Sequence, residues 1–341
     1  MTKAFITGVS GTALSSAERR FIASERPWGF ILFRRNVETP SQAITLIREL
    51  RSALGEANAP VLIDQEGGRV QRLQPPHWPA YPAGAVFGRL YDIDPALGLT
   101  AARLSARLIA DDLFKLGISV DCLPLADVPV AGADAVIGDR AYGSESAKVA
   151  AIARAVTTGL EQGGILPVLK HIPGHGRAAA DSHIALPSVD APENELDRTD
   201  FAAFRPLADL PMAMTAHVVF TALDPAHPAT TSATMINKVI RGSIGFQGLL
   251  MSDDVSMNAL AGTIAERTAA VFAAGCDMVL HCNGKLEEMC EVARATPELK
   301  GRAKERAATA LASSRTPLPF DRTAARAELD ALIGRAGAAH T

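Results

Sequence analysis

The sequence lacks an apolar run long enough to cross a membrane, because no window approaches the about 18 consecutive apolar residues that a spanning helix needs. Its first twenty residues, MTKAFITGVSGTALSSAERR, contain one lysine, a short apolar run and no A-x-A cleavage signal. We therefore expect a cytoplasmic protein that is not exported and has no membrane partner.

An excess of charge of one sign is also missing. The 34 Lys and Arg residues face 37 Asp and Glu residues, the net charge is −3, and the basic residues are scattered along the chain. Nucleic-acid-binding proteins usually gather basic residues on one surface. This pattern disfavours a nucleic-acid partner and favours a small, neutral or mildly polar ligand.

Cysteines are few, and no two of them form a C-x-x-C pair. All four fall within predicted strands or helices: Cys122, Cys276, Cys282 and Cys290. Such cysteines are typical of reduced thiols in a protein core. The sequence thus predicts neither a structural zinc site nor any other metal or cofactor.

Short apolar, strand-forming runs recur along the chain. There are eight of them: AFITGV from Ala4, GFILFR from Gly29, PVLIDQ from Pro60, ISVDCLPLADV from Ile118, PVLKHI from Pro167, AMTAHVVF from Ala213, GLLMSDD from Gly248 and MVLHC from Met278. Helical patterns separate most of them, including SQAITLIRELRSAL, AKVAAIARAVTTGLEQG, ENELDRTDFAAFRPLAD and AERTAAVFAAG.

Buried strands that alternate with helices indicate a parallel α/β sheet covered on both sides. Eight such units close most economically into a single (β/α)8 barrel of the TIM type, and a doubly wound sheet is the alternative. We expect one catalytic domain over residues 1–341, with a helical tail from about residue 316 packed on the barrel. We also expect a monomer.

The carboxyl ends of barrel strands form the active face of this fold. Titratable residues stand at or just after six of the predicted strands: Asp64 with the following residues to Arg72, Arg140, Lys170 with His171, His217, Asp253 with Asp254, and His281. A further titratable stretch, VLKHIPGHGRAAADSHIALP, is too broken by Pro and Gly to be one helix or strand. These residues predict a polar site on one rim of the barrel.

Three motifs resemble those of bacterial β-N-acetylglucosaminidases of glycoside hydrolase family 3, the cytoplasmic kind used in cell-wall recycling. They are DQEGGRVQRL, then KHIPGHG with the following DSH, then SDD at the end of a later strand. The resemblance spans roughly residues 4–284. It implies a barrel and a retaining mechanism, in which an aspartate attacks the anomeric carbon and a loop histidine serves as acid and base.

The resemblance assigns the catalytic residues. The family pattern places the nucleophile directly after the serine of SDD, which selects Asp253 over Asp254, and strand alternation predicts that the two do not face the barrel mouth alike. His183 titrates near neutral pH, and Asp181 is placed to accept a hydrogen bond from its ring. We expect Asp181 and His183 to form the acid/base dyad.

The positions that hold the N-acetylglucosamine unit in this family correspond here to five residues: Asp64, Arg72, Arg140, Lys170 and His171. His175 is expected to shape its loop. Asp127 and His217 are candidates for supporting contacts. The resemblance further implies cleavage of the bond between N-acetylglucosamine and 1,6-anhydro-N-acetylmuramic acid in muropeptides.

Three other interpretations remain open from the residues alone. GHGRAA fits the dinucleotide pattern G-x-G-x-x-A, but no helical pattern follows it directly. Several histidines with Asp253 allow a metal-dependent barrel hydrolase, although the first predicted strand carries no metal ligand. A non-catalytic sugar-binding protein is the third, and it would not need Asp181, His183 and Asp253 together.

Overall fold

The computed structural model describes residues 1–178, 182 and 185–338 of the chain. Within them, nine parallel strands form one sheet in the order β7-β6-β3-β2-β1-β13-β12-β10-β8. Their bounds are β1 (Lys3–Thr7), β2 (Pro27–Leu32), β3 (Val61–Ile63), β6 (Val120–Asp121), β7 (Leu166–Pro167), β8 (Leu169–Ile172), β10 (Met212–Thr215), β12 (Leu249–Asp254) and β13 (Met278–His281).

The sheet closes on itself. β7 and β8 stand at opposite ends of the strand order, yet only Val168 separates them in the chain. β7 pairs with β6, β8 pairs with β10, and a bridge between Leu125 and Lys170 joins the segment after β6 to β8. Counted as one strand, residues 166–172 complete eight positions around a barrel. The prediction of a (β/α)8 barrel is thus confirmed, and the doubly wound alternative is wrong.

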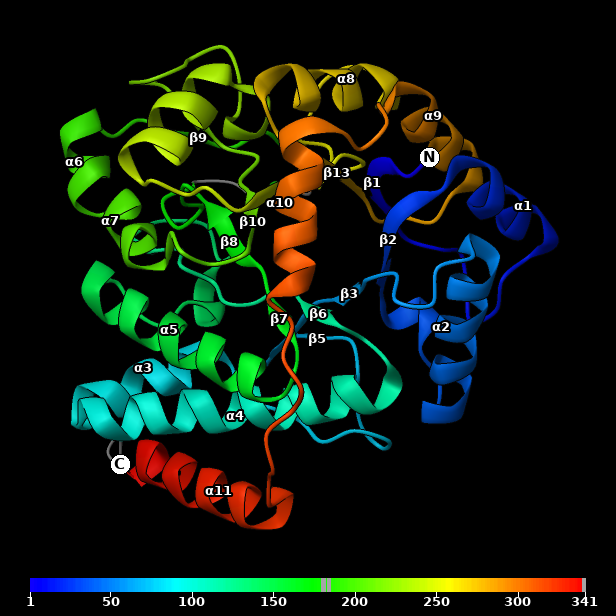
Figure 1. The fold of residues 1–341 in the computed structure, drawn as a ribbon. Coiled ribbons are helices and arrows are strands. Elements are labelled where there is room, and N and C mark those ends of the chain that lie inside the picture. The colour runs from blue at the N-terminus through cyan, green and yellow to red at the C-terminus, as the bar shows by residue number, and fades with distance from the viewer. Residues whose placement is uncertain (179–181, 183–184, 339–341) are drawn as a thin grey trace.

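Helices surround the barrel (Figure 1). They are α1 (Ser16–Glu25), α2 (Pro40–Leu54), α3 (Gly84–Ile93), α4 (Pro95–Leu116), α5 (Ser146–Gln162), α6 (Glu193–Arg198), α7 (Asp200–Phe204), α8 (Ile264–Ala274), α9 (Leu286–Ala295), α10 (Gly301–Ala312) and α11 (Arg322–Ala338). Their ends follow capping rules: the Ser15 side chain and Glu18 form a capping box at the start of α1, and Gly55 ends α2 in the left-handed region.

One predicted helix is interrupted. The stretch from Glu193 to Asp209 forms α6, α7 and the short turn η3 (Arg205–Leu207). The break falls at Thr199, whose φ and ψ of −115° and −79° depart from those of a regular α-helix. Pro206 lacks the N–H that would extend α7. The prediction that this stretch is helical is therefore confirmed, but the prediction of one continuous helix is wrong.

Strand alternation divides the core into two layers. In β1, Ile6 belongs to the cluster inside the barrel, whereas Phe5 packs in the layer between the sheet and the helices. Four methionines fill the barrel interior: Met212, Met214, Met251 and Met278. The interior is therefore a packed core rather than a channel.

Smaller elements complete the carboxyl-terminal face. β4 (Gln65–Gly67) and β5 (Val70–Gln71) form an antiparallel hairpin directly after β3, and β9 (Ser188–Val189) pairs in parallel with β11 (Val219–Phe220). The remaining short helical turns are η1 (Arg34–Asn36), η2 (Gly138–Arg140), η4 (Ala229–Thr231) and the wider η5 (Met235–Ser243).

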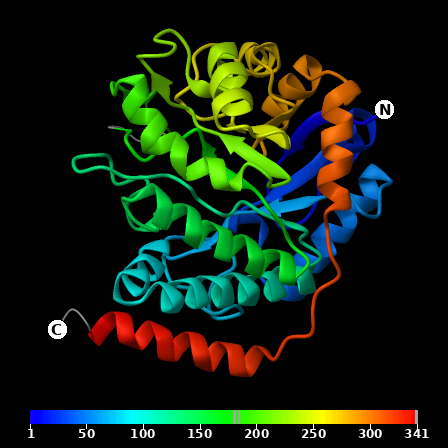
Figure 2. The ribbon, with the colours of Figure 1, turned by 60° about the vertical axis from the view of Figure 1, so that its left-hand side comes forward.

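The last helix, α11, lies beside α4, and an extended segment connects it to α10 (Figures 1 and 2). Arg322 holds it there through ion pairs of 2.7 Å to both Asp111 and Asp112 of α4. No helix in the described part of the chain has the length and apolar character to span a bilayer.

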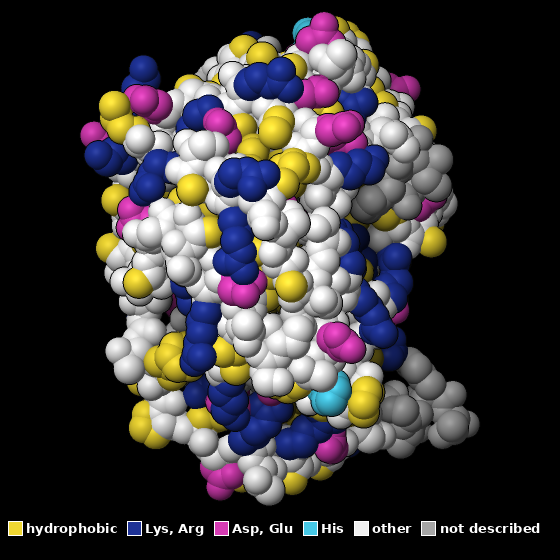
Figure 3. Space-filling model, turned by 90° about the vertical axis from the view of Figure 1, so that its right-hand side faces the viewer, with side chains coloured by type: hydrophobic (Ala, Val, Ile, Leu, Met, Phe, Trp, Pro, Cys, Tyr) yellow, Lys and Arg dark blue, Asp and Glu magenta, His cyan; other side chains and the backbone are white. Residues whose placement is uncertain are grey.

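On the face shown in Figure 3, Lys and Arg side chains are spread from the top to the bottom of the molecule, with Asp and Glu side chains among them. All four cysteines are free, and Cys122, Cys276 and Cys282 are buried.

Candidate active site

The carboxyl ends of the barrel strands surround a pocket of about 710 Å³, measured out to its open mouth. Part of its apolar lining belongs to the top of the barrel interior: Ile31, Met214, Leu280 and Cys282. Its titratable lining comprises Asp64, Glu66, Arg72, Arg140, Lys170, His171, His175, Asp253 and Asp254.

Asp64 and Arg72 face each other across the β4–β5 hairpin. The Asp64 carboxylate accepts a hydrogen bond of 3.1 Å from Arg72 Nη2. The Gln65 side-chain oxygen accepts the backbone N–H groups of Arg72 and Leu73, both at 2.9 Å, and so holds together the open end of the hairpin. Arg72 Nε is buried and has no hydrogen-bond partner within the described residues.

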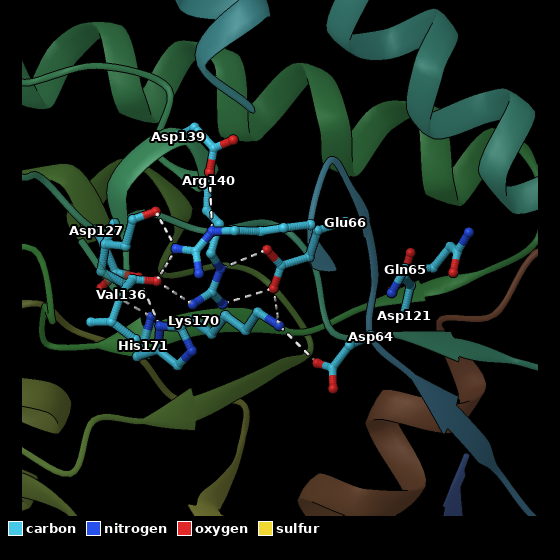
Figure 4. Close-up of polar contacts among 12 residues, drawn as sticks. Asp64, Gln65, Glu66, Asp121, Asp127, Val136, Asp139, Arg140, Lys170 and His171 are labelled. Carbon is cyan, nitrogen blue, oxygen red and sulfur yellow. Dashed lines mark hydrogen bonds and ion pairs between the residues drawn. The ribbon is translucent and has the colours of Figure 1, made fainter. Parts of the chain in front are cut away.

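Glu66 is the centre of a buried ion cluster (Figure 4). Arg140 binds it with two hydrogen bonds, from Nε at 2.9 Å and from Nη2 at 2.8 Å. Lys170 Nζ lies 2.7 Å from Glu66 and 2.9 Å from Asp64. Segments around β3 and β4, η2 and β8 are thereby joined by charge-assisted contacts at one wall of the pocket.

These contacts keep the cluster ionised although it is buried. Burial alone would raise the pKa of Glu66, but the positive charges of Lys170 and Arg140 outweigh it and lower the pKa to about 2. The same balance, with Lys170 and Arg72 as the cations, holds the pKa of Asp64 well below its usual range. Burial would lower the pKa of Lys170, but Asp64 and Glu66 raise it instead. The pocket wall therefore offers fixed charges that can hydrogen-bond to hydroxyl groups.

Asp127 organises the two histidines beside this cluster. Its carboxylate lies 2.7 Å from His171 Nδ1 and accepts the backbone N–H of His175 at 2.6 Å. Burial would raise the pKa of Asp127, but His171 lowers it to about 2. Since Nδ1 faces a carboxylate, it carries a proton, and the opposite edge of the His171 ring is directed away from Asp127.

His175 is buried in the loop that begins after β8. Its Nε2 lies 3.0 Å from the hydroxyl of Ser182, and its Nδ1 has no partner among the described residues. Burial lowers the pKa of His175 to about 4. The expected catalytic pair Asp181 and His183 lies outside the described residues, so Ser182 is the part of the DSH motif that can be located, and it lines the pocket.

At the end of β12, Asp253 and Asp254 both line the pocket. The alternation rule predicted that the two would face differently. β12 is irregular, because residues 251–254 pair with residues 278–280 of β13 and one residue is left over. The carboxylate of Asp254 accepts hydrogen bonds from the Ser256 N–H, the Ser256 hydroxyl and the Cys282 N–H. The Asp254 carboxylate is therefore engaged by Ser256 and by the Cys282 N–H.

The structure brings Asp253 and all five predicted sugar-binding residues to one pocket. Sequence reasoning missed Glu66, although it stands in the motif that was singled out. It lies two residues after Asp64, and side chains two apart in an extended segment share a face, which is the signal that would have found it. Asp127 was considered only as a supporting residue, and it is the hydrogen-bond partner of His171.

Among the described residues, no three His, Cys, Asp or Glu side chains form a group that could hold a metal ion. What the pocket does combine is a carboxylate at a strand end with a wall of fixed cations and carboxylates. Such groups can orient a polyhydroxylated ring while a carboxylate approaches one of its carbons.

The chain matches known proteins over most of its length. Residues 6–310 match the model of the glycosyl hydrolase family 3 N-terminal domain. Over 283 residues the chain is 41% identical to a β-hexosaminidase of Alkalilimnicola ehrlichii, and the match covers 81% of this chain and 79% of that protein. A β-hexosaminidase of Thioalkalivibrio sulfidiphilus is 39% identical over 279 residues, with coverage of 81% and 79%.

A solved structure is similar in fold and sequence. It is NagZ from Neisseria gonorrhoeae in complex with N-trifluoroacetyl-D-glucosamine, with a TM-score of 0.88 and 31% identity. The match covers 97% of this chain and 98% of that one.

Proposed function

The chain belongs to glycosyl hydrolase family 3, and on this basis we propose that it is an exo-β-N-acetylglucosaminidase that acts with retention of configuration. The observation that carries the proposal is a single pocket that contains both Asp253 and the buried ion cluster around Glu66, which includes Lys170 and Asp64. The similar NagZ structure is a complex with N-trifluoroacetyl-D-glucosamine, which supports the choice of sugar.

In the proposed reaction, Asp64, Arg72, Arg140, Lys170 and His171 bind the hydroxyl groups and the N-acetyl group of the terminal sugar. Asp253 attacks the anomeric carbon and forms a covalent glycosyl-enzyme. His183, oriented by Asp181, gives a proton to the leaving oxygen. It then takes a proton from the water that attacks the same carbon from the vacated face, so two inversions retain the β configuration.

The substrate we propose is a muropeptide in which N-acetylglucosamine is linked to 1,6-anhydro-N-acetylmuramic acid. The DQEGGRVQRL, KHIPGHG and DSH motifs support it through their resemblance to enzymes of cell-wall recycling. A cytoplasmic location, a single catalytic domain with its helical tail, and a monomeric state belong to the same proposal, and neither metal nor cofactor is required.

Hydrolysis of a nitrophenyl N-acetyl-β-glucosaminide, followed by proton NMR of the first sugar released, tests the reaction. We expect the β-anomer first, and activity that withstands exhaustive chelation. Asp253→Asn should abolish turnover, whereas Asp190→Asn, a change of an exposed carboxylate, should not. An initial α-anomer would exclude the covalent intermediate.

The natural substrate needs a second measurement. Incubation with anhydro-muropeptides, with and without the peptide, should release free N-acetylglucosamine that mass spectrometry detects. Cleavage of the chromogenic substrate alone would support the enzyme class and contradict the proposed aglycone.

A further inference from the structure

On the side of β10, the backbone ladder that holds β12 ends before it reaches Asp253. On the β10 side, the last pair in register is Met214 with Met251. Asp253 and Asp254 therefore extend two and three residues beyond that ladder. Regular strand pairing does not fix their position on this side.

The ladder on the β13 side is irregular at the same place. Residues 251–254 of β12 face only residues 278–280 of β13. The Leu280 N–H donates to the Ser252 hydroxyl at 3.0 Å, so a side chain contributes a contact at the irregularity. Bulges of this kind redirect side chains near active sites, and other contacts must then hold them.

His217 supplies such a contact. It follows β10 by two residues and is fully buried. Its Nε2 lies 3.0 Å from the backbone oxygen of Asp254. A carbonyl oxygen can only accept, so Nε2 carries the proton and donates it. His217 thus connects the segment after β10 to the end of β12, at a position where backbone hydrogen bonds no longer join these two strands.

The other ring nitrogen of His217, Nδ1, faces the hydroxyl group of Thr230. His217 Nδ1 lies 2.8 Å from Thr230 Oγ1, and with the proton on Nε2 this nitrogen must accept. The Thr230 hydroxyl also lies 3.0 Å from the Ala216 carbonyl and 2.8 Å from Thr215 Oγ1. The Thr230 hydroxyl has one proton, which it can share between the Ala216 carbonyl and Nδ1, and the Thr215 hydroxyl can in turn donate to Thr230. The Asp254 carbonyl fixes the ring tautomer, and the Thr230 hydroxyl is compatible with it.

We propose that His217 is a positioning residue that sets the place of Asp253 by holding the backbone of Asp254. The inference rests on the proposed function, in which Asp253 is the nucleophile. The Asp254 N–H donates to Asp253 Oδ1 at 2.8 Å, so a shift of residue 254 moves the donor that orients the attacking carboxylate.

The remaining contacts of Asp254 agree with this role. Its carboxylate accepts the Cys282 N–H of the β13 side at 3.0 Å, while its carbonyl accepts from His217 on the β10 side. Residue 254 is thus held between two neighbouring strands. Burial lowers the pKa of His217, which outweighs the opposite effect of Asp253, and the ring is therefore neutral and has the single N–H that this geometry uses.

The test compares His217→Leu, which removes the donor, with His217→Gln, whose amide N–H can still reach a carbonyl. We expect kcat on the nitrophenyl substrate to fall about 10²-fold in His217→Leu, as for a displacement of a reacting group by roughly 1 Å. In His217→Gln it should fall less than about tenfold. The inhibition constant of N-acetylglucosamine should change less than about twofold, because the sugar-binding residues lie on other strands.

Thr230→Val keeps the shape of the residue and removes only the hydroxyl. We expect an intermediate fall in kcat, again without a change in sugar affinity. His227→Leu and Thr231→Val are the matched controls, since His227 is exposed and the Thr231 hydroxyl makes a long contact of 3.5 Å to the Pro228 carbonyl. Both controls should keep wild-type kcat. If His217→Leu does not fold, His217→Gln and Thr230→Val decide the matter.

A slow-reacting fluorinated N-acetylglucosaminyl fluoride separates this inference from the proposed function. Peptide mapping of the trapped enzyme should find the sugar on Asp253, and His217→Leu should be labelled about 10²-fold more slowly. A label on another residue would overturn the proposed mechanism and this inference with it. A label on Asp253 with unchanged kcat in His217→Leu, or equal losses in kcat and sugar affinity, would overturn the role of His217 alone.

Discussion

Glu66 shows how a single buried carboxylate can control the charge of a binding pocket. It accepts hydrogen bonds from Arg140 and forms an ion pair with Lys170, and its side chain is almost completely buried. Breaking a buried pair by removing one partner commonly costs about 3–5 kcal/mol, because the remaining charge loses its compensation. Arg140 and Lys170 both form ion pairs with Glu66, so its removal should lower the free energy of unfolding and weaken sugar binding.

We expect Glu66→Gln to lower kcat/KM on an N-acetylglucosaminide by roughly 10- to 100-fold, mainly through KM. One charge-assisted hydrogen bond contributes about 1.5–3 kcal/mol. Steady-state kinetics and thermal unfolding measure the two effects. Asp139→Asn is the control, because Asp139 also pairs with an arginine, Arg69, but at an exposed site. Equal effects of the two substitutions would contradict the central role of Glu66.

His183 is predicted to act as the acid/base, and a general acid matters most when the leaving group is poor. His183→Ala should therefore lose about 10² to 10⁴ in rate on a disaccharide with an alcohol leaving group, and much less on a nitrophenyl glycoside. Added azide should partly restore turnover, because it replaces the water that lacks its base. Asp253→Ala should show no such rescue. Equal losses on both substrates without rescue would assign His183 to binding.

At the scale of elements, α3 sets the position of the loop that carries Arg140. Gly84 and Gly88 stand one turn apart on the same face of α3. A Cβ atom at Gly84 would lie 2.1 Å from the Arg140 carbonyl oxygen, and one at Gly88 would lie 2.0 Å from the Tyr142 carbonyl oxygen. The loop can approach the helix only because both side chains are absent.

Gly84→Ala should therefore displace the loop, raise KM and destabilise the fold by about 1–3 kcal/mol, as overpacking does. Gly334→Ala in α11 is the matched control, because a Cβ there meets nothing within 4 Å. It should stabilise the protein by up to about 1 kcal/mol through helix propensity. Urea unfolding measures the change in unfolding free energy of each variant, and steady-state kinetics measures the change in KM. A stabilised Gly84→Ala variant with unchanged KM would show that the loop is not held by α3.

At the scale of the whole molecule, buried imidazoles make stability depend on pH. Burial lowers the pKa of His175 from its usual 6.5 to about 4. Between these pH values the unfolded chain binds a proton that the folded chain does not bind, so stability falls as the pH falls. Glu66 and Asp127, with pKa values of about 2, keep their charges throughout this window.

We expect protonation of His175 in the unfolded chain to lower the free energy of unfolding by up to about 3 kcal/mol as the pH falls from 6.5 to 4. Urea unfolding at pH 4, 5, 6 and 7 measures the slope. His175→Gln should show a shallower slope than the wild type. The slope should not vanish, because burial also lowers the pKa values of His217 and His281. His227→Gln, a change of an exposed histidine, should leave it unaltered; a parallel slope for His175→Gln would contradict the prediction.

The local pattern of the sequence predicted most of the architecture. All eight strand positions, the helices corresponding to α2, α5 and α8, and the side of the barrel that carries the site follow from periodicity and from residues at strand ends. Each of these depends on neighbours within a few positions of the chain, so each can be derived without coordinates. The breaks at Thr199 and Pro206 show the limit, because hydrophobic pattern does not specify continuity.

The sequence by itself determined the residue types and their place at the rim: Asp64, Lys170, His171 and Asp253 were expected there from their strand ends. Only the tertiary structure decided their partners. Glu66 lies more than 70 residues from Arg140, and the Asp254 carboxylate accepts the N–H of Cys282, a residue 28 positions away. Strand periodicity is local, whereas register and ion pairing depend on how distant segments fit in a closed barrel, and that fit is settled only by packing the whole chain.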